Sequence, residues 1–587
     1  MKRTIAVVVV LMLFCFDPAY AQWSGSVCAD GAWGFNRNNR ENADFKLKYT
    51  GKKFFVGSDI YVGHNFLQSS KTTTILDAKK EQDEYYKGEN KEISPRKLNA
   101  GAGIDFGYIF NPYNKLGATV GYGFSGTDEK SVQQTERYNN SDKSTLDGTQ
   151  VDTTYVAGHN ITTGISYERL FASRPDARLG ISLLGTTKLN SDANRRITSG
   201  IFYPKPKNYA TFSSLNEFNA RLAAVYEDIF HFRKSDLKLR TGLDCISNQD
   251  IDGYYAKTLV NGQWRDSTQY KQSYFYDSQT IEPYVNLTYT FGKFDFSVKE
   301  RVQVYRHYIL DKLDERKSPE DLDGLFDKCD AKNLLEAGVT YRIDARHRVM
   351  LNYGRTISRP DYKKLCPTLM IGKSDGEYFI GNPELLPETT DKVNLGYSYT
   401  KGIFVTKLDF SYRDKKNTAE KVIDLEKSKD ITDPGVKTLY TWINNKRQQS
   451  LGSRLDLKIN GKEIKADIWA GLNFDRYWKN DKTDKEDFNY ELGTSVDVFL
   501  NETTKLSSSL AYISDRQSAY NYKGEDVIAN LRFSRIVIKG MELYLELKDI
   551  VDKDIVEETW NEERTYLKIT TTTPMSRMVV LGLSYSF

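Results

Sequence analysis

The chain ends in Val579-Val580-Leu581-Gly582-Leu583-Ser584-Tyr585-Ser586-Phe587, and this stretch decides how the rest is interpreted. Its odd positions all hold apolar or aromatic residues, and small residues (Gly582, Ser584 and Ser586) stand between the last four of them. Side chains of a β-strand point alternately to opposite faces, so a period of two predicts a strand with one apolar face. The pattern continues to the last residue of the chain.

The same alternation recurs through much of the sequence. Apolar residues occupy alternate positions in further segments, namely Arg454–Ile459, Asp467–Phe474, Glu491–Leu500 and Met541–Lys548. The composition agrees, because 39 Tyr and 40 Gly against 14 Pro in 587 residues suit extended strands better than helices or disorder. A formal net charge of +4, from 83 basic and 79 acidic residues, argues against a nucleic-acid-binding protein.

The breaks between these strands alternate in length. Short polar turns are expected near residues 50–52, 111–114, 173–176, 233–235, 292–293, 344–346, 401–402, 460–462, 501–503 and 539–540. Longer polar stretches lie between them, including Gln68–Arg96, Asp128–Asp152, Asn190–Ser213, Asn248–Ser273, Asp311–Ala331 and Arg359–Thr390. This rhythm is typical of a bacterial transmembrane β-barrel with short periplasmic turns and long extracellular loops. Ten turns and two chain ends then predict an antiparallel barrel of about 22 strands.

A lipid environment gives the reason for closing the sheet. In hydrocarbon every backbone N–H and C=O needs a protein partner, so strands with an apolar outer face must form a sheet without edges. The alternative is a secreted β-sandwich array or solenoid, in which the apolar faces pack against a second sheet. That alternative explains neither the short-and-long rhythm nor a terminal strand that ends at Phe587, so we predict the barrel. Leu583, Tyr585 and Phe587 are its expected C-terminal signal for the outer-membrane assembly machinery.

The N-terminal residues have the composition of a targeting segment. Lys2 and Arg3 precede an apolar run from Ile5 to Phe16, and Ala19-Tyr20-Ala21 follows as a cleavage site, which together predict a secretory signal peptide. The apolar run falls short of the roughly 18 residues that a spanning helix needs. We therefore expect a signal peptide at residues 1–21 and a barrel domain at residues 22–587, integral to the outer membrane of a Gram-negative bacterium.

One predicted strand breaks the alternation. Between Phe294 and Tyr305 the apolar residues are placed so that Glu300 falls on the lipid side. A β-bulge, which inserts one extra residue, would turn this carboxylate away from lipid. We expect either a bulge or a different register in this strand.

A loop motif resembles a known family. The sequence Ser358-Arg359-Pro360 is followed by Gly381-Asn382-Pro383-Glu384-Leu385-Leu386-Pro387-Glu388, and the pair resembles a motif in the barrels of TonB-dependent receptor-like outer-membrane proteins. The strand rhythm extends this resemblance from about Ser26 to Phe587. The resemblance implies that the motif lies on an outer loop and the strand after it. We expect a scaffold role, since the prolines stiffen the loop while Gly381 and Asn382 permit a turn.

The resemblance also implies parts for which this sequence leaves little room. Receptors of the family carry a plug domain inside the barrel and a segment before it that engages an energy-transducing partner. Only Gln22–Gly25 separates the predicted cleavage site from the expected first strand, Ser26–Phe35. We therefore expect a barrel without its own plug. Loops such as 68–96, 128–152 and 359–390 would fold inward, and a separate plug or a surface lipoprotein would complete the occlusion.

The sequence contains little that points to catalysis. The five histidines form no metal-binding cluster, there is no serine-hydrolase elbow, and Gly121–Gly126 matches a dinucleotide motif only within a strand. We expect no enzyme activity, no cofactor and no metal site.

Cysteines and inward-facing charges suggest pairings within the barrel. Cys329 and Cys366 both fall in predicted outer loops and suggest a disulfide. Inward-facing charges of both signs predict paired ladders, at Lys238, Arg240, Asp295, Lys299, Arg301, Arg454, Asp456, Lys458, Glu542 and Glu546.

Four functions remain open at this stage. The leading hypothesis is passage or capture of a solute at the cell surface, with a partner protein. A non-conducting scaffold for a surface lipoprotein or an assembly, a general diffusion porin and, last, a barrel-embedded enzyme are the alternatives. The sequence does not name the solute or the partner.

Overall fold

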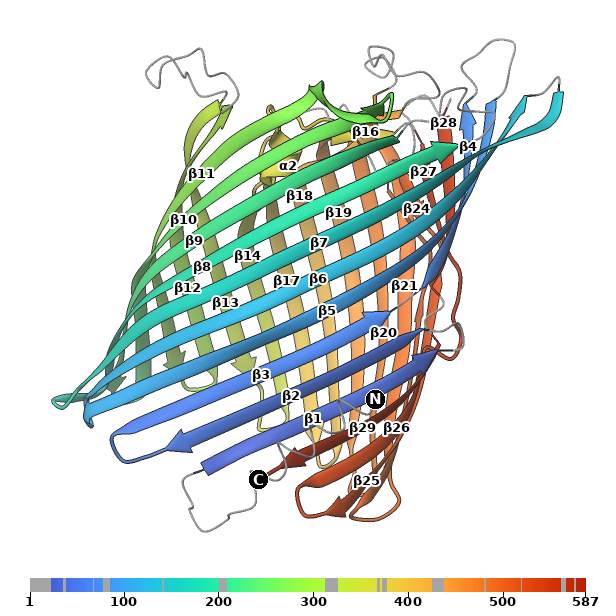
Figure 1. Cartoon of the computed structure of the whole chain (residues 1–587). Helices are drawn as coiled ribbons and strands as arrows, with labels where there is room; N and C mark the ends of the chain where they lie inside the picture. Colours follow the sequence, from blue (N-terminus) through green and yellow to red (C-terminus); the bar gives the residue numbers. More distant parts are fainter. Residues whose placement is uncertain are drawn as a thin grey trace.

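The computed structural model describes residues 23–34, 38–66, 68–77, 85–139, 142–199, 208–311, 326–366, 370–371, 377–424, 438–479, 482–518, 520–560, 566–574 and 577–587. These residues form a closed antiparallel β-barrel of 22 wall strands, as predicted (Figure 1). The predicted signal peptide, residues 1–21, lies outside the described residues. Among the residues described, no helix has the length and apolar character needed to cross a bilayer.

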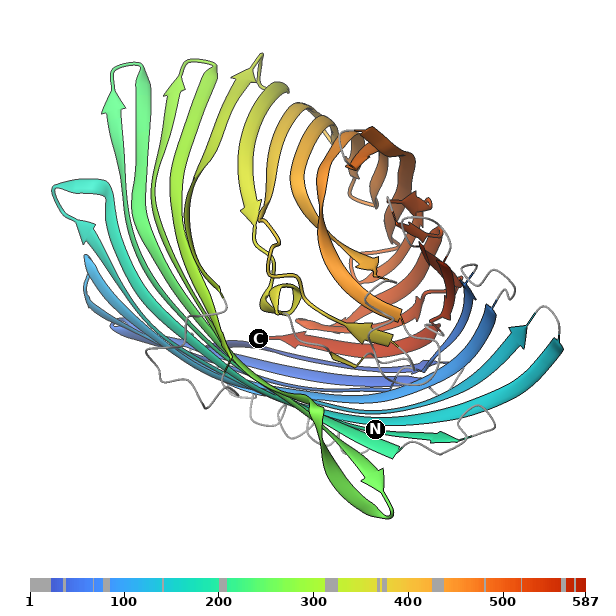
Figure 2. The ribbon, with the colours of Figure 1, turned by 90° about the horizontal axis from the view of Figure 1, so that it is seen from above.

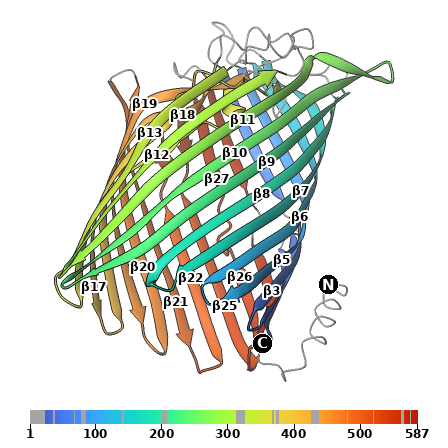
Figure 3. The same ribbon diagram turned by 90° about the vertical axis from the view of Figure 1, so that its left-hand side faces the viewer.

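The wall strands follow one another around the barrel in chain order. They are β1 (Trp23–Gly34), β2 (Asn39–Thr50), β3 (Phe54–Phe66), β5 (Tyr85–Asn111), β6 (Asn114–Asn139), β7 (Asp142–Phe171), β8 (Arg174–Ser199), β9 (Asn208–Phe232), β10 (Ser235–Val260), β11 (Gln263–Phe291), β12 (Phe294–Asp311), β13 (Phe326–Arg342), β14 (His347–Ser358), β17 (Glu388–Lys401), β18 (Phe404–Ile423), β19 (Thr438–Asn460), β20 (Ile464–Lys479), β21 (Lys482–Phe499), β22 (Thr504–Ile513), β25 (Asp526–Ile538), β26 (Met541–Lys548) and β29 (Met578–Ser586). All ten predicted short turns connect neighbouring wall strands at one rim. The long strands β7–β11, with 25 to 30 residues each, form a strongly tilted face of the wall (Figure 3).

The barrel closes where β1 pairs with β29, from Ser26 opposite Ser586 to Gly34 opposite Met578. At the end of this seam the backbones of Gly25 and Phe587 exchange two hydrogen bonds of 3.0 and 3.1 Å. A Cβ on Gly25 would lie 2.5 Å from the ring of Phe587, so glycine makes room for the terminal aromatic side chain. Tyr585 stacks on Phe587 with 5.7 Å between ring centroids. The C-terminal residues thus close the sheet.

The short turns carry the residues that tight turns require. Gly292, Gly402 and Gly540 have positive φ angles of 57°, 56° and 83°, which glycine adopts without steric cost. In the turn between β13 and β14, Asp344 Oδ1 accepts the backbone N–H groups of Arg346 and His347 at 2.7 and 2.8 Å. Both hydrogen bonds lower the pKa of the Asp344 carboxyl below its ordinary value, and the one from Arg346 has the larger effect.

The outward face is apolar, as the alternation predicts. Side chains such as Ile104, Val120, Ile165 and Leu581 are more than half exposed, a position that suits them in lipid and not in water. The prediction of a bulge or a different register near Glu300 is wrong. Glu300 pairs with Val285 and Leu335, and the register is unchanged on either side of it, so its carboxylate stays on the outward face. The apolar alternation of a whole strand and its neighbours fixes the register, and the cost of one outward-facing charge is too small to shift it.

Two of the three loops expected to fold inward do not. The stretch 68–96 forms β4 (Ser69–Asp77) and the outer half of β5, and the stretch 128–152 continues the β6–β7 hairpin. Because strand pairing satisfies the backbone N–H and C=O groups of these stretches, they form hairpins that continue the wall instead of loops that enter the lumen. Five small strands extend the sheet above the outer rim of the wall. They are β4, β28 (Tyr566–Thr573), β27 (Ile555–Trp560), β24 (Asn521–Lys523) and β23 (Arg516–Gln517), and each pairs with the next in this order.

Candidate functional site

The third loop does fold inward, and it carries the loop motif. We call its described residues 359–366, 370–371 and 377–387 the strap; it leaves β14 at Ser358 and enters β17 at Glu388, two residues that are register partners. The strap contains α2 (Tyr362–Leu365), β15 (Met370–Ile371) and β16 (Glu377–Phe379). Viewed along the barrel, α2 lies inside the ring of wall strands (Figure 2).

Apolar contacts show how far the strap reaches. Leu365, Cys366 and Leu385 of the strap are buried in one cluster with Tyr274 and Tyr276 of β11 and Ile309 of β12. Ala419 of β18 and Trp442 of β19 pack against the same cluster. Strands β11–β12 and β18–β19 are separated along the wall by β13, β14 and β17. The strap therefore crosses the lumen as a chord between two parts of the wall.

Gly381 lets two segments of the strap run side by side. The N–H of Gly381 donates to the carbonyl of Cys366 at 2.8 Å, and that of Asn382 donates to the carbonyl of Lys364 at 2.7 Å. A Cβ on residue 381 would lie 2.2 Å from the Cys366 carbonyl oxygen, closer than real Cβ contacts allow. Glycine at this position is thus a requirement of close backbone approach.

Asn382 fixes the strap to the wall. Its Oδ1 accepts the backbone N–H of Glu384 at 2.9 Å, which forms the turn, and its Nδ2 donates to the carbonyl of Trp442 at 2.9 Å. Asn444, also on β19, accepts the N–H of Leu386 at 2.7 Å and donates to the carbonyl of the same residue at 3.1 Å. Sequence reasoning missed Asn444, since nothing local marks an amide 58 residues further along the chain as a partner of the strap.

Arg359 fixes the other end. Its guanidinium lies 3.8 Å from the ring centroid of Tyr305, forms a 2.7 Å ion pair with Asp330, and donates to Gln303 Oε1 at 3.1 Å. Its side chain is only 14% exposed. A planar, always charged guanidinium is suited to this combination of stacking and multiple donation.

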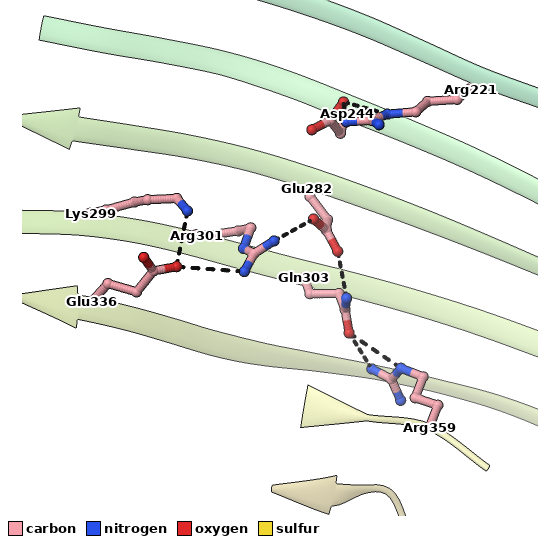
Figure 4. Close-up of polar contacts among 8 residues, drawn as sticks. All are labelled: Arg221, Asp244, Glu282, Lys299, Arg301, Gln303, Glu336 and Arg359. Carbon is pink, nitrogen blue, oxygen red and sulfur yellow. Dashed lines mark hydrogen bonds and ion pairs between the residues drawn. The ribbon is translucent and has the colours of Figure 1, made fainter. Parts of the chain in front are cut away.

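A chain of polar contacts continues from Arg359 along the inner wall (Figure 4). Gln303 also donates to Glu282, which accepts from Arg301 at 3.3 Å. Arg301 and Lys299 then share Glu336, at 3.8 and 2.9 Å. Further ion pairs line the lumen, as the prediction of paired charges of both signs requires. They include Arg240–Glu227, Arg342–Asp295, Arg454–Asp456, Lys458–Asp467 and Arg532–Glu542.

The remaining motif residues lie at the edges of the strap. Pro360, Pro383 and Pro387 line, with Arg359, a small cavity of about 400 Å³ against β12 and β13. Glu388 forms a 3.4 Å ion pair with Lys415 of β18, while Glu384 is exposed. The motif thus shapes and anchors the strap.

The predicted disulfide between Cys329 and Cys366 is not formed in this structure. Cys366 is buried in the strap cluster. Asp330 points into the lumen toward Arg359, so Cys329 beside it on β13 points to the opposite face, where it is exposed. Alternation along one strand separates the two thiols.

A second segment that folds inward was not foreseen. The hairpin β23–β24 leaves the wall after β22 and reaches β18, where Ser518 and Asn521 donate to Glu420 Oε1 at 2.9 and 3.2 Å. Tyr520 is buried with Trp560 of β27, against partly buried Val422, Ile443, Tyr522 and Leu567. We call this hairpin with β27 the roof. The described residues include no group of His, Cys, Asp or Glu side chains that could hold a metal ion.

Comparisons with solved structures agree with this architecture. The copper transporter OprC superposes with a TM-score of 0.66 at 12% identity, covering 97% of this chain and 81% of that one. The ferric citrate transporter FecA in its unliganded form gives 0.63 at 12% identity, covering 96% and 79%. The ferric enterobactin receptor PfeA of Pseudomonas aeruginosa gives 0.59 at 13%, covering 97% and 81%. At such identities the likeness shows the fold alone.

These structures are barrels of the TonB-dependent receptor type that the loop motif resembles. No protein among the curated sequences matches this chain. The model of the outer membrane protein beta-barrel family, however, matches residues 175–585, which run from the start of β8 to the end of β29. The chain therefore belongs to the outer membrane protein beta-barrel family and is an integral protein of the outer membrane.

Proposed function

We propose that the protein passes a solute across the outer membrane through the barrel lumen, and that the strap gates this passage. The observation that carries the proposal is the chord that the strap forms between β11–β12 and β18–β19. The lumen around it is lined by paired charges and amides, which suit a polar solute. The proposal assigns no chemical reaction to the protein.

The contacts that hold the strap support a movable gate. The described strap is held by an apolar cluster, backbone hydrogen bonds and the Arg359–Asp330 ion pair, all of which are reversible. Its two ends enter adjacent, paired strands. The strap can therefore be displaced or shortened while the 22-stranded wall keeps its pairing.

Planar-bilayer recording tests the gate. A variant in which a short Gly-Ser turn replaces residues 361–386 keeps Ser358 opposite Glu388 and should show a large, steady conductance. The unaltered chain should conduct little, with brief openings. Large, steady conductance of the unaltered chain would contradict occlusion, and a closed shortened variant would contradict the strap as its gate.

We include a partner protein in the proposal, either a separate plug or a surface lipoprotein. The hairpin of β6 and β7, with 26 and 30 residues per strand, is far longer than the roughly ten residues that cross a bilayer. The same protruding sheet favours a second candidate function, a non-conducting scaffold for a surface lipoprotein. Gentle detergent extraction followed by mass spectrometry identifies the partner, and a stable partner without any solute flux would favour the scaffold.

A further inference from the structure

A polar chamber lies between the roof and the lumen face of β18–β21. Its volume is about 710 Å³, within the range of small-molecule sites, which is about 300–1,000 Å³. Ser518 and Asn521 hold the roof to Glu420 of β18, so the roof spans the wall strands that form the floor. The chamber is separate from the cavity beside Arg359, and it shares no lining residue with it.

Strand register builds the floor of the chamber in rows. One row runs across four strands through Ser411, Gly452, Asn473 and Asn489, and the row next to it through Arg413, Ser450, Asp475 and Asp487. Because neighbours in a row lie about 5 Å apart, amide, hydroxyl and carboxylate groups form a continuous polar grid. Such a grid offers donors and acceptors over an area rather than at one point.

Hydrogen bonds hold the carboxylates of this grid in place. The amide of Asn489, which is 5% exposed, donates to Asp475 at 3.2 Å and to Asp487 at 3.1 Å. Asp475 also accepts from the Ser450 hydroxyl and from Gln448. A carboxylate has about four acceptor positions, so Asp487 keeps acceptor positions for a ligand in an orientation already fixed by its neighbour.

Gly452 allows close packing at the centre of the floor. A Cβ there would lie 2.8 Å from Asn473 Oδ1 and 2.9 Å from Ser411 Oγ. Glycine therefore lets the side chains of Asn473 and Ser411 stand close together over the backbone of residue 452, and any larger residue would displace them.

The chemistry of the lining selects the class of occupant. The charged lining groups are five carboxylates and three cations, which disfavours an anionic solute. The hydroxyl and amide groups of the lining both donate and accept, as the hydroxyls of a sugar do, and its carboxylates add strong acceptors. Tyr477 and Tyr522 add two aromatic rings to the lining. We propose that the chamber binds a neutral, polyhydroxylated solute, an oligosaccharide a few residues long. This inference rests on the proposed passage of a solute and names its class.

Binding of the purified full chain in detergent to an array of neutral and acidic oligosaccharides tests the proposal. Neutral oligosaccharides should bind, and Asp487→Asn and Gly452→Val should each weaken binding about tenfold or more. The first change removes a charged acceptor, and the second displaces the Asn473 and Ser411 side chains of the floor. The matched control is Asp244→Asn, which alters a lumen carboxylate paired with Arg221 outside the chamber and should leave binding unchanged (Figure 4). A heat-dependent shift on gels confirms that each variant folds.

Several outcomes would overturn the proposal. They are no binding to any neutral oligosaccharide, binding to acidic oligosaccharides or to spermidine alone, and an equal loss in the Asp244→Asn control. Binding in detergent does not depend on flux through the barrel. If neutral oligosaccharides fail to bind, the strap-shortened variant is therefore still expected to conduct, and the proposed passage of a solute is not refuted. Conversely, a closed shortened variant that still binds neutral oligosaccharides would refute passage and leave the chamber in place.

Discussion

Replacing Arg359 by alanine should release the strap. The change removes a 2.7 Å ion pair with Asp330, a 3.1 Å hydrogen bond to Gln303 and the stacking on Tyr305, and it leaves Asp330 without its counter-ion. Removing one partner of a buried ion pair costs about 3–5 kcal/mol. Asp330 is 32% exposed, which places the expected cost at the lower end, about 3 kcal/mol.

That cost applies only to the docked strap, so it shifts the equilibrium toward the displaced one. Because about 1.4 kcal/mol corresponds to a tenfold change, the open fraction should rise about a hundredfold. Single-channel recording in planar bilayers measures this fraction directly. Arg359→Lys keeps the charge and loses the planar fork and the stacking, so it should fall between the alanine variant and the unaltered chain.

A double-mutant cycle with Asp330→Asn isolates the ion pair. If the pair holds the strap, the double variant should open less than the sum of the two single effects implies. An open fraction of Arg359→Ala within about threefold of the unaltered chain would refute the reasoning, since 3 kcal/mol cannot be lost from a gate without a larger change. So would strict additivity, because it would show that Arg359 acts through other groups.

Four further predictions follow from individual contacts. Gly381→Val should displace the strap, since its Cβ would overlap the Cys366 carbonyl, and limited proteolysis should then cleave the strap faster; unchanged cleavage would count against the close approach. In whole cells a membrane-impermeant maleimide should leave Cys366 unlabelled until Gly381→Val is introduced; equal labelling in both backgrounds would contradict its burial. Phe587→Ala should weaken the β1–β29 seam and lower the temperature of the heat-dependent gel shift, which a conservative Phe587→Tyr should restore. The lowered pKa of Asp344 means that its charged form stabilises the turn at neutral pH and that this contribution is lost as the pH falls through that pKa, so Asp344→Ala should flatten the acid limb of the same measurement.

The wall of the barrel could be read from local patterns. Alternation with period two decides which side of a strand faces lipid, and short turns with Gly292, Gly402 or Gly540 mark where the chain reverses. Both signals lie within a few residues, so the strand number, the ten turns and the closing strand at Phe587 were all predictable. Glu300 shows the limit of this reading, because one charge on the lipid face does not outweigh the register of a whole strand.

The residues of the lumen were predictable only as a class. Inward charges were expected to pair, and eight of the ten that we named form ion pairs among the described residues. The partners of Arg359, however, could not be named from the sequence. The same holds for Asn444 and Glu420, which bind the strap and the roof from strands far along the chain. A contact between a loop and a distant strand leaves no periodic trace in either segment.

The sequence by itself determined the fold class, the strand count and the side of each strand that faces lipid, because a bilayer imposes the same local demand on every strand. The tertiary structure alone decided which outer segments stand upright and which cross the lumen. The described residues of stretches 68–96 and 128–152 form hairpins and those of 359–387 form the strap, although all three stretches are polar and irregular in sequence. Their difference arises from the strands that surround them, since a loop settles wherever neighbouring walls satisfy its backbone and bury its few apolar side chains.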